Sequence, residues 1–166
     1  MMTRLLPHQW QILRDLRLAS LADSEQWFAS TVEAESQLTD EQWQERATEV
    51  WGLLILDAPC GLVRISPVDD DRGSDCWITA WWIDPRCRGQ GHAHRMQDWL
   101  DDTSRERQWR VQGLGVWPEN TRAIAAYQRL GYIPLGEPKP STRRPGQFYQ
   151  EMLRRVPTTS GEHHGR

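Results

Sequence analysis

The sequence predicts a mixed α/β protein in which one sheet is packed between helices. Two observations carry this prediction: short apolar, β-branched segments alternate with segments of helical periodicity, and a hairpin pattern precedes the strand–helix units. Because hairpin neighbours occur on both sides of those units, a doubly wound nucleotide-binding fold is disfavoured. The length of 166 residues predicts a single domain over 1–156, followed by a polar, disordered tail at 157–166.

The first 49 residues are predicted to be mostly helical. A short strand at residues 3–6 precedes a helix at 7–22, whose apolar residues recur on one side. A turn and a second helix are expected within 25–38. Thr39 has the side chain of an N-cap and begins a third helical segment that extends to residue 49.

The rest of the chain alternates strands with helices. Residues 76–83 are apolar, β-branched or aromatic, which is typical of a buried strand, and residues 121–130 precede a glycine that predicts a helix C-terminus. The elements expected after residue 49 are, in order, a hairpin of strands 50–56 and 61–66, the buried strand 76–83, a helix ending near 107, a strand 111–117, the helix 121–130, a short strand 132–135, a loop 136–146 and a last strand 147–154.

A turn rich in glycine and arginine, residues 86–93, lies between the buried strand and the next helix. Glycines let the main chain approach a ligand closely, and the first turn of a helix has N–H groups without intrahelical partners. Arg86 and Arg88 add forked donors that suit phosphate. The turn is therefore interpreted as a cradle for a pyrophosphate, held mainly by the main chain of 89–93. The alternative is a tight strand-to-helix turn with surface arginines.

The same residues carry a resemblance to a known family. Arg86-x-x-Gly89-x-Gly91-x-Ala93 matches the Q/R-x-x-G-x-G/A pattern of the GNAT N-acetyltransferase superfamily. A second block, Asn120-x-x-Ala123-x-x-Ala126-Tyr127-x-x-Leu130-Gly131-Tyr132, is similar to the N-x-x-A-x-x-x-Y-x-x-x-G-F/Y signature of that family. The resemblance covers about the second half of the chain. It implies a mixed, mostly antiparallel sheet whose central parallel strands splay apart, with helices on both faces.

The resemblance also implies acetyl-CoA as the acyl donor. The residues expected to bind it are Trp82, Ile83, Arg86, Arg88, Gly89, Gln90, Gly91, His92, Ala93, Asn120 and Tyr127. Trp82 and Ile83 are assigned through their main chain, at the end of the buried strand. Tyr127 is also the expected catalytic residue, a general acid that protonates the departing thiolate. The alternative for Tyr127 is a core position on an amphipathic helix.

Two glycines, Gly113 and Gly115, lie on one face of the predicted strand 111–117. They are expected to mark a bulge. In the resembling family, a bulge splays this strand from its parallel neighbour, and the arm of the cofactor enters the gap. The alternative is that the two glycines make room for bulky tryptophans.

The general base is not fixed by these motifs. An aliphatic amine must lose a proton before it attacks, yet the two central strands carry no acid beyond Asp75 at the start of one of them. A water-mediated base is expected, and the alternatives are three acids of the segment that covers the acceptor site in the family, Glu25, Glu33 and Glu35.

Aromatic residues are the candidates for the acceptor side. Trp81 and Trp82 point to opposite faces of their strand, so that one enters the core and the other lines the acceptor side. Together with Trp81, Trp27 and Phe28 are expected to form an apolar substrate-binding wall. The alternative is that all of these residues belong to the core.

Composition excludes several other functions. The net charge of −3 gives no basic field for nucleic acid or an anionic membrane, and no apolar run is long enough to span a bilayer. Three cysteines are expected to be reduced thiols, and the N-terminus lacks a signal sequence, which predicts a soluble cytoplasmic protein. Cys87, His92 and His94 match no common metal-site spacing, so no metal is expected.

The expected function is transfer of acetyl from acetyl-CoA to a primary amine, by direct attack in a ternary complex. A small-molecule amine is the favoured acceptor, and a protein N-terminus or lysine is the second. An alternative from another class is a non-catalytic acyl-CoA-binding module. The oligomeric state is left open, with a homodimer as one alternative.

Overall fold

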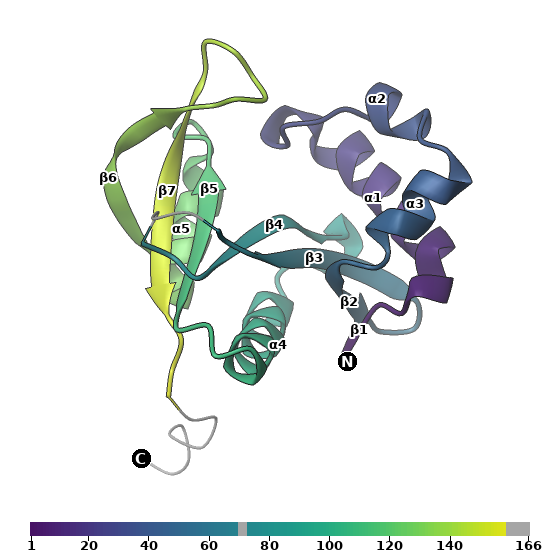
Figure 1. Cartoon of the computed structure of the whole chain (residues 1–166), viewed down its shortest axis with the longest axis horizontal. Helices are drawn as coiled ribbons and strands as arrows, with labels where there is room; N and C mark the ends of the chain where they lie inside the picture. The colour runs from purple at the N-terminus through teal and green to yellow at the C-terminus, as the bar shows by residue number, and fades with distance from the viewer. Residues whose placement is uncertain (70–72, 159–166) are drawn as a thin grey trace.

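The structure is a computed structural model of the chain and describes residues 1–69 and 73–158. Within them, seven strands form one sheet in the order β1-β2-β3-β4-β5-β7-β6 (Figure 1). Neighbouring strands are antiparallel except β4 and β5, which are parallel, so the predicted fold class is confirmed. The strands are β1 Met2–Arg4, β2 Val50–Ile55, β3 Pro59–Pro67, β4 Cys76–Ile83, β5 Val111–Val116, β6 Ile133–Pro140 and β7 Phe148–Arg155.

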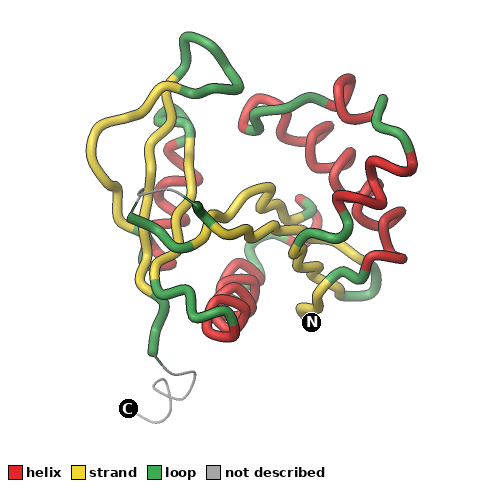
Figure 2. Tube along the Cα trace, in the orientation of Figure 1, coloured by secondary structure: helices red, strands yellow, loops and turns green. Residues whose placement is uncertain are grey.

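Helices cover both faces of the sheet and bury two separate hydrophobic clusters. On one face, Met96 and Leu100, four residues apart on α4, are fully buried. On the other face, Leu13 of α1 and Trp43 of α3 pack over β2 and β3. Figure 2 shows α1–α3 gathered apart from α4. The helices are η1 Pro7–Gln9, α1 Trp10–Ser24, η2 Glu25–Trp27, α2 Val32–Ser36, α3 Asp40–Arg46, η3 Pro85–Cys87, α4 His92–Glu106 and α5 Thr121–Leu130.

The parallel strands β4 and β5 pair over only the first part of their length. Their register runs from Cys76 opposite Gln112 to Ile78 opposite Leu114. Beyond that point β4 stays paired with β3 as far as Ile83, and β5 stays paired with β7 through Val116. The predicted splay of the central parallel strands is therefore present, and it leaves residues 79–83 of β4 without a partner strand on the β5 side.

The irregularity behind this divergence lies in β4. The β3–β4 register shifts between Leu62 and Arg64, and Ala80 on β4 has a positive φ of 55°, which is uncommon for a residue with a side chain. The pairing of β5 with β7 has no register shift. The expectation of a bulge on β5 is thus wrong.

The two β5 glycines instead make room for aromatic side chains. The alternative named tryptophans, and Trp77 lies near both glycines, with Tyr149 nearer to Gly115. A Cβ atom at Gly113 would lie 2.9 Å from the ring of Trp77, and one at Gly115 would lie 3.0 Å from the ring of Tyr149. Contacts this short would force the rings to move. The glycines are explained by packing across the sheet and not by main-chain irregularity.

Strand β6 is longer than predicted. The segment 136–140 was expected to be a loop because it contains two prolines, but it continues β6, and the loop to β7 spans 141–147. Gly136, with a φ of 65°, lies where the β6–β7 register shifts between Leu135 and Lys139, so pairing resumes after the irregularity. Prolines are tolerated because β6 is an edge strand. The predicted disordered tail lies outside the described residues from residue 159 onward.

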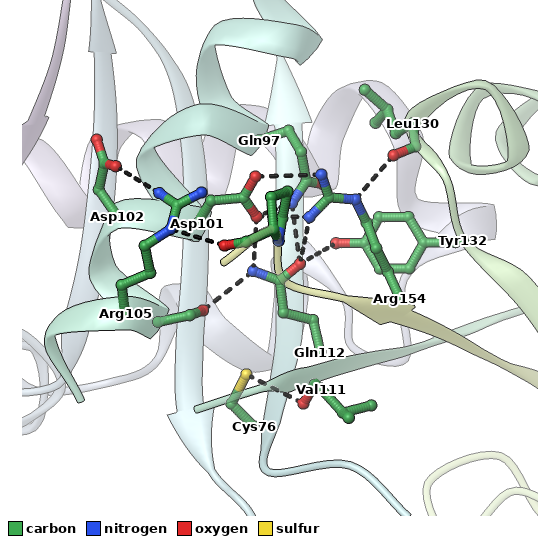
Figure 3. Close-up of polar contacts among 12 residues, drawn as sticks. Cys76, Gln97, Asp101, Asp102, Arg105, Val111, Gln112, Leu130, Tyr132 and Arg154 are labelled. Carbon is green, nitrogen blue, oxygen red and sulfur yellow. Dashed lines mark hydrogen bonds and ion pairs between the residues drawn. The ribbon is translucent and has the colours of Figure 1, made fainter. Parts of the chain in front are cut away.

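A buried polar network joins α4 to strands β5 and β7 (Figure 3). Arg154 Nη2 donates to Asp101 Oδ2 at 3.1 Å, and Gln112 Nε2 donates to Asp101 Oδ1 at 3.1 Å. Gln97 Nε2 donates to Gln112 Oε1 at 2.9 Å, and the hydroxyl of Tyr132 donates to the same oxygen at 3.4 Å. Because Arg154 Nε also donates to the carbonyl oxygen at the end of α5, the network fixes α5 on the sheet.

Candidate active site

The predicted cradle is a short connection between β4 and α4. The turn η3 follows β4, and Gly89 and Gly91 have φ angles of 76° and 80°, in the region that favours glycine. Gly91 is the N-cap of α4 and offers no side chain to the first turn. No hydrogen bond from the main-chain N–H groups of 91–93 to any described residue is present. These donors, at the positive end of a fifteen-residue helix, fit an anion.

The two arginines of the cradle are paired with carboxylates of the chain. Arg86 contacts both oxygens of Asp84, at 3.0 and 2.8 Å, and its hydrogen bonds lower the pKa of Asp84 to about 2. Arg88 donates to the carbonyl oxygen of Ile83 at 2.8 Å and to Asp23 Oδ2 at 2.7 Å. Arg88 thus ties the turn to the end of β4 and to α1. The main-chain N–H groups of 91–93, by contrast, have no partner among the described residues.

The other predicted cradle residues lie at the start of α4. His92 is buried, and its ring nitrogens lie 3.3 Å from Gln90 Oε1 and from Arg95 Nη1. The His92 imidazole therefore contacts other side chains of the protein. The main-chain N–H of His92 is one of the groups of 91–93 that have no partner among the described residues. Ala93, the next residue, has too small a side chain to cover those groups.

The end of β4 brings Trp82 and Ile83 to the edge of the gap between β4 and β5. Trp82 pairs with Leu62 of β3, and its indole N–H donates to Asp23 Oδ2 at 3.0 Å. Asp23 therefore accepts hydrogen bonds from both Trp82, near the end of β4, and Arg88. It was not identified from the sequence, because nothing in its local pattern separates it from an ordinary acid near a helix end.

Tyr127 lies on α5 between two aromatic rings. Its ring centroid is 5.8 Å from that of Trp81 and 5.9 Å from that of Tyr132, and the side chain is half-buried. Burial raises the pKa of Tyr127 to about 12, so the phenol is protonated at neutral pH. No described residue forms a hydrogen bond with its hydroxyl. Two turns earlier, the side chain of Asn120 accepts from the Ala123 N–H at 3.2 Å and caps α5.

The predicted substrate-wall residues do not form one surface. Phe28 packs against the cluster under α1–α3, with the Arg17 guanidinium 5.1 Å from its ring centroid. Trp81 packs against the cluster on the opposite face, beside Tyr127. Trp27 is 37% exposed. Trp81 and Trp82 do face opposite sides of the sheet, as predicted.

The three candidate acids are in different settings. Glu35 is buried between Arg17 and Arg46, with hydrogen bonds of 3.0 and 2.9 Å. Burial alone would raise the pKa of Glu35, but the two guanidinium groups outweigh that effect and lower it. A carboxylate held in this way is a poor proton acceptor. Glu25 and Glu33 are exposed.

Two features near the gap were missed by sequence reasoning. Arg144, in the loop between β6 and β7, donates to main-chain carbonyl oxygens of the turn at 25–28. Glu151 on β7 is fully buried opposite Gly115. One of its oxygens is paired to Lys139, and no described residue forms a hydrogen bond with the other. Both contacts join residues distant in sequence, so no local pattern could have indicated them.

The described part of the chain contains neither a metal-binding cluster nor a membrane-spanning helix. Among residues 1–69 and 73–158, no three His, Cys, Asp or Glu side chains are grouped so that they could hold a metal ion. In that same part of the chain, no helix is long and apolar enough to cross a membrane.

Solved structures of other proteins share this fold. Solved structures with similar folds include a GNAT-family acetyltransferase from Streptococcus pneumoniae, with 15% identity, a TM-score of 0.74, and coverage of 95% of this chain and 99% of that one. A ribosomal-protein-alanine N-acetyltransferase from Brucella melitensis has 16% identity, a TM-score of 0.69, and coverage of 94% and 99%. An acetyltransferase from Salmonella typhimurium, solved with its cofactor acetyl-CoA, has 13% identity, a TM-score of 0.69, and coverage of 96% and 95%.

Sequence comparison gives a family assignment. No curated protein sequence matches the chain significantly. The family model described as the acetyltransferase (GNAT) family matches residues 11–132, which is more than half of the chain. That match includes the cradle, the splayed strands and Tyr127, and the chain therefore belongs to the GNAT family of acetyltransferases.

Proposed function

We propose that the protein transfers an acetyl group from acetyl-CoA to a primary amine of a small molecule, by direct attack in a ternary complex. The observation that carries the proposal is the set of N–H groups at 91–93 that have no partner among the described residues. They lie next to the part of β4, residues 79–83, that has no partner strand on the β5 side. A diphosphate bound there would leave the rest of a coenzyme free to lie along the open edge of 79–83. The Salmonella structure with acetyl-CoA supports this donor.

Different residues of the chain would bind different parts of acetyl-CoA. The main chain of 89–93 would bind the diphosphate, and Arg86 and Arg88 would add positive charge beside it. The open edge of β4 at Trp82 and Ile83 would bond the amide groups of the pantetheine arm. Asn120, at the start of α5, would contact the same arm. Acetyl-CoA supplies a thioester that is already activated toward an amine.

Tyr127 is the proposed general acid. Its hydroxyl is protonated at neutral pH and has no partner among the described residues, so it is free to donate to a ligand. Trp81 and Tyr132 restrict its ring from two sides. Positioned beside the sulfur, the phenol would give its proton to the departing thiolate.

Two of the three thiols, those of Cys60 and Cys76, are buried and are poor nucleophiles, which disfavours a covalent enzyme intermediate on either of them. Burial raises the pKa of Cys60 to about 11 and that of Cys76 to about 12, so both are thiols at neutral pH. The attacking amine must lose a proton, and we propose that water carries it away, since Glu35 is held by two arginines.

A protein N-terminus is the second candidate acceptor. The fold of the Brucella enzyme, which is named for the ribosomal protein alanine that it acetylates, is similar to this one. A search across both acceptor classes is therefore needed, together with a binding measurement that does not depend on turnover.

The experiment combines calorimetry with thiol release. The purified chain is titrated with acetyl-CoA and then assayed against polyamines, amino acid derivatives, aminoglycosides and short peptides. Binding with turnover on a small amine supports the proposal. Turnover confined to peptides favours the second candidate, and binding without turnover on any amine favours a non-catalytic acyl-CoA-binding module. No binding of acetyl-CoA contradicts the proposal.

A further inference from the structure

Arg144 joins two parts of the molecule that lie on opposite sides of the gap between β4 and β5. Its guanidinium donates to the carbonyl oxygens of Glu25 at 2.9 Å and Gln26 at 3.1 Å, and also to that of Phe28. The same guanidinium lies 5.2 Å from the ring centroid of Trp117. We call Arg144, Trp117 and the carbonyl groups of 25–28 the clasp.

Trp117 adds a second connection across the same place. It directly follows β5, and its indole N–H donates to the carbonyl oxygen of Trp27 at 3.0 Å. Trp117 is buried, although it lies at the end of a strand that has parted from its neighbour. Figure 1 shows the loop between β6 and β7 and the far end of α1 approaching each other above the diverging strands.

The two sides that the clasp joins belong to different layers. The turn at 25–28 continues α1, which packs over β3 and β4. Arg144 and Trp117 belong to the β5, β6 and β7 part of the sheet. Helices α4 and α5, with the cradle and Tyr127, lie on the other face. If the donor occupies that face, the amine must reach the gap from the face where the clasp lies.

The hydrogen bonds of the clasp suit a stable connection between its two sides. A guanidinium presents five N–H donors in a plane, which suits several carbonyl groups that converge on one point. Glu25 is the C-cap of α1, so its carbonyl oxygen also carries part of the negative charge of a helix C-terminus.

We propose that Arg144 is a specificity-determining residue that restricts the acceptor to small amines. This proposal rests on the function proposed above and names its acceptor class. In this proposal the clasp bars an amine that continues into a polypeptide, because such an acceptor needs an open path through the clasp and a small amine does not. Specificity then arises from exclusion of the longer acceptor and not from tighter binding of the shorter one.

The test compares Arg144→Ala with Arg143→Ala. Arg143 is the exposed neighbour in the same loop, and its replacement removes the same charge without touching the clasp. The ratio of kcat/KM for a short peptide to kcat/KM for a small amine is measured for both variants and the parent chain. We expect the ratio to rise at least ~10-fold in Arg144→Ala and to stay unchanged in Arg143→Ala. Arg144→Lys, which keeps the charge but loses the planar fork, should give an intermediate ratio.

Hydrogen exchange supplies a readout that does not depend on turnover. Amide exchange over 24–30 and 141–148 should accelerate in Arg144→Ala only, while acetyl-CoA affinity stays the same. An unchanged acceptor ratio in Arg144→Ala overturns the proposal, whether or not exchange accelerates, and so does a parent chain that acetylates peptides as well as small amines. Absence of turnover on any amine contradicts the proposed function itself, and the specificity role falls with it.

Discussion

The two polar regions on α4 differ in how their hydrogen-bonding groups are used. In the buried network, Asp101, Gln112 and Arg154 point at one another, and most of their donors and acceptors are paired within the chain. At the start of the same helix, the N–H groups of 91–93 have no partner among the described residues. Paired polar groups hold a fold together, whereas unpaired donors at a helix start are available to a ligand. Changes in the first region should therefore affect stability, and changes in the second should affect binding.

The largest expected effect is on stability, from Asp101→Ala. This change leaves the Arg154 guanidinium buried beside Gln112 without its carboxylate. Loss of one partner of a buried ion pair typically costs about 3–5 kcal/mol in the free energy of unfolding. Urea denaturation followed by circular dichroism measures the change. Acetyl-CoA affinity of the folded fraction should stay within about threefold, and a large loss of affinity would show that the two regions are not separate.

The reverse pattern is expected for Gly89→Trp. No heavy atom lies within 4 Å of the Cβ position at Gly89, so the fold has room for a side chain there, although the positive φ introduces local strain. The added side chain would stand where a diphosphate must approach the main chain. Loss of one or two charge-assisted hydrogen bonds should weaken acetyl-CoA binding about 100-fold, measured by calorimetry. The melting temperature should fall by only a few degrees, and unchanged affinity would falsify the cradle assignment.

Elements that are marked by neighbouring residues could be predicted from the sequence. Contacts between residues far apart in the sequence could not. The bounds of β4 and α5 were predicted correctly because apolar runs, proline and glycine mark them directly. The turn between β4 and α4 was predicted because its glycines and arginines lie within six residues of one another, and its role as a cradle stays a prediction. The buried network joins residues up to 53 positions apart, and Arg144 reaches carbonyl groups 116 to 119 positions away. Such partners are chosen by tertiary packing, which leaves no periodic signal.

The wrong predictions for β5 and β6 also arise from tertiary packing. The bulge was expected on β5 because glycine is the usual residue at an irregular position, but Ala80 on β4 adopts the positive φ. Its conformation is imposed by the strands around it. The two prolines at 136–140 were expected to end β6, and they did not, because an edge strand has no ladder bond to lose on its outer side.

A smaller effect is expected from Tyr127→Phe, which tests the catalytic side of the site. Removing the hydroxyl should lower kcat about 10- to 100-fold, in the range typical of lost general acid catalysis, and should leave acetyl-CoA affinity within about threefold. Because the ring packs on Trp81 and Tyr132, phenylalanine preserves those contacts. Stopped-flow or steady-state thiol release measures kcat. Tyr132→Phe is the matched control, since it removes a buried hydroxyl next to the same ring, and it should change stability more than kcat.

The smallest expected effect is from Asp84→Asn. Asp84 shares one property with each of the two regions. Asp84 is paired, like the network, but its partner Arg86 is exposed and belongs to the cradle. Arg86 lowers the pKa of Asp84 to about 2, which is below its unfolded value of about 4. The stabilisation from this carboxylate is therefore complete above pH ~4 and is lost as the pH falls toward 2. Exposure screens the pair, so Asp84→Asn should change the unfolding midpoint little at pH 7 and not at all near pH 2. Its effect on acetyl-CoA affinity should be under about threefold, because the main-chain donors of 91–93 remain in place; a loss comparable to that of Gly89→Trp would shift the binding role from the main chain to the Arg86 guanidinium.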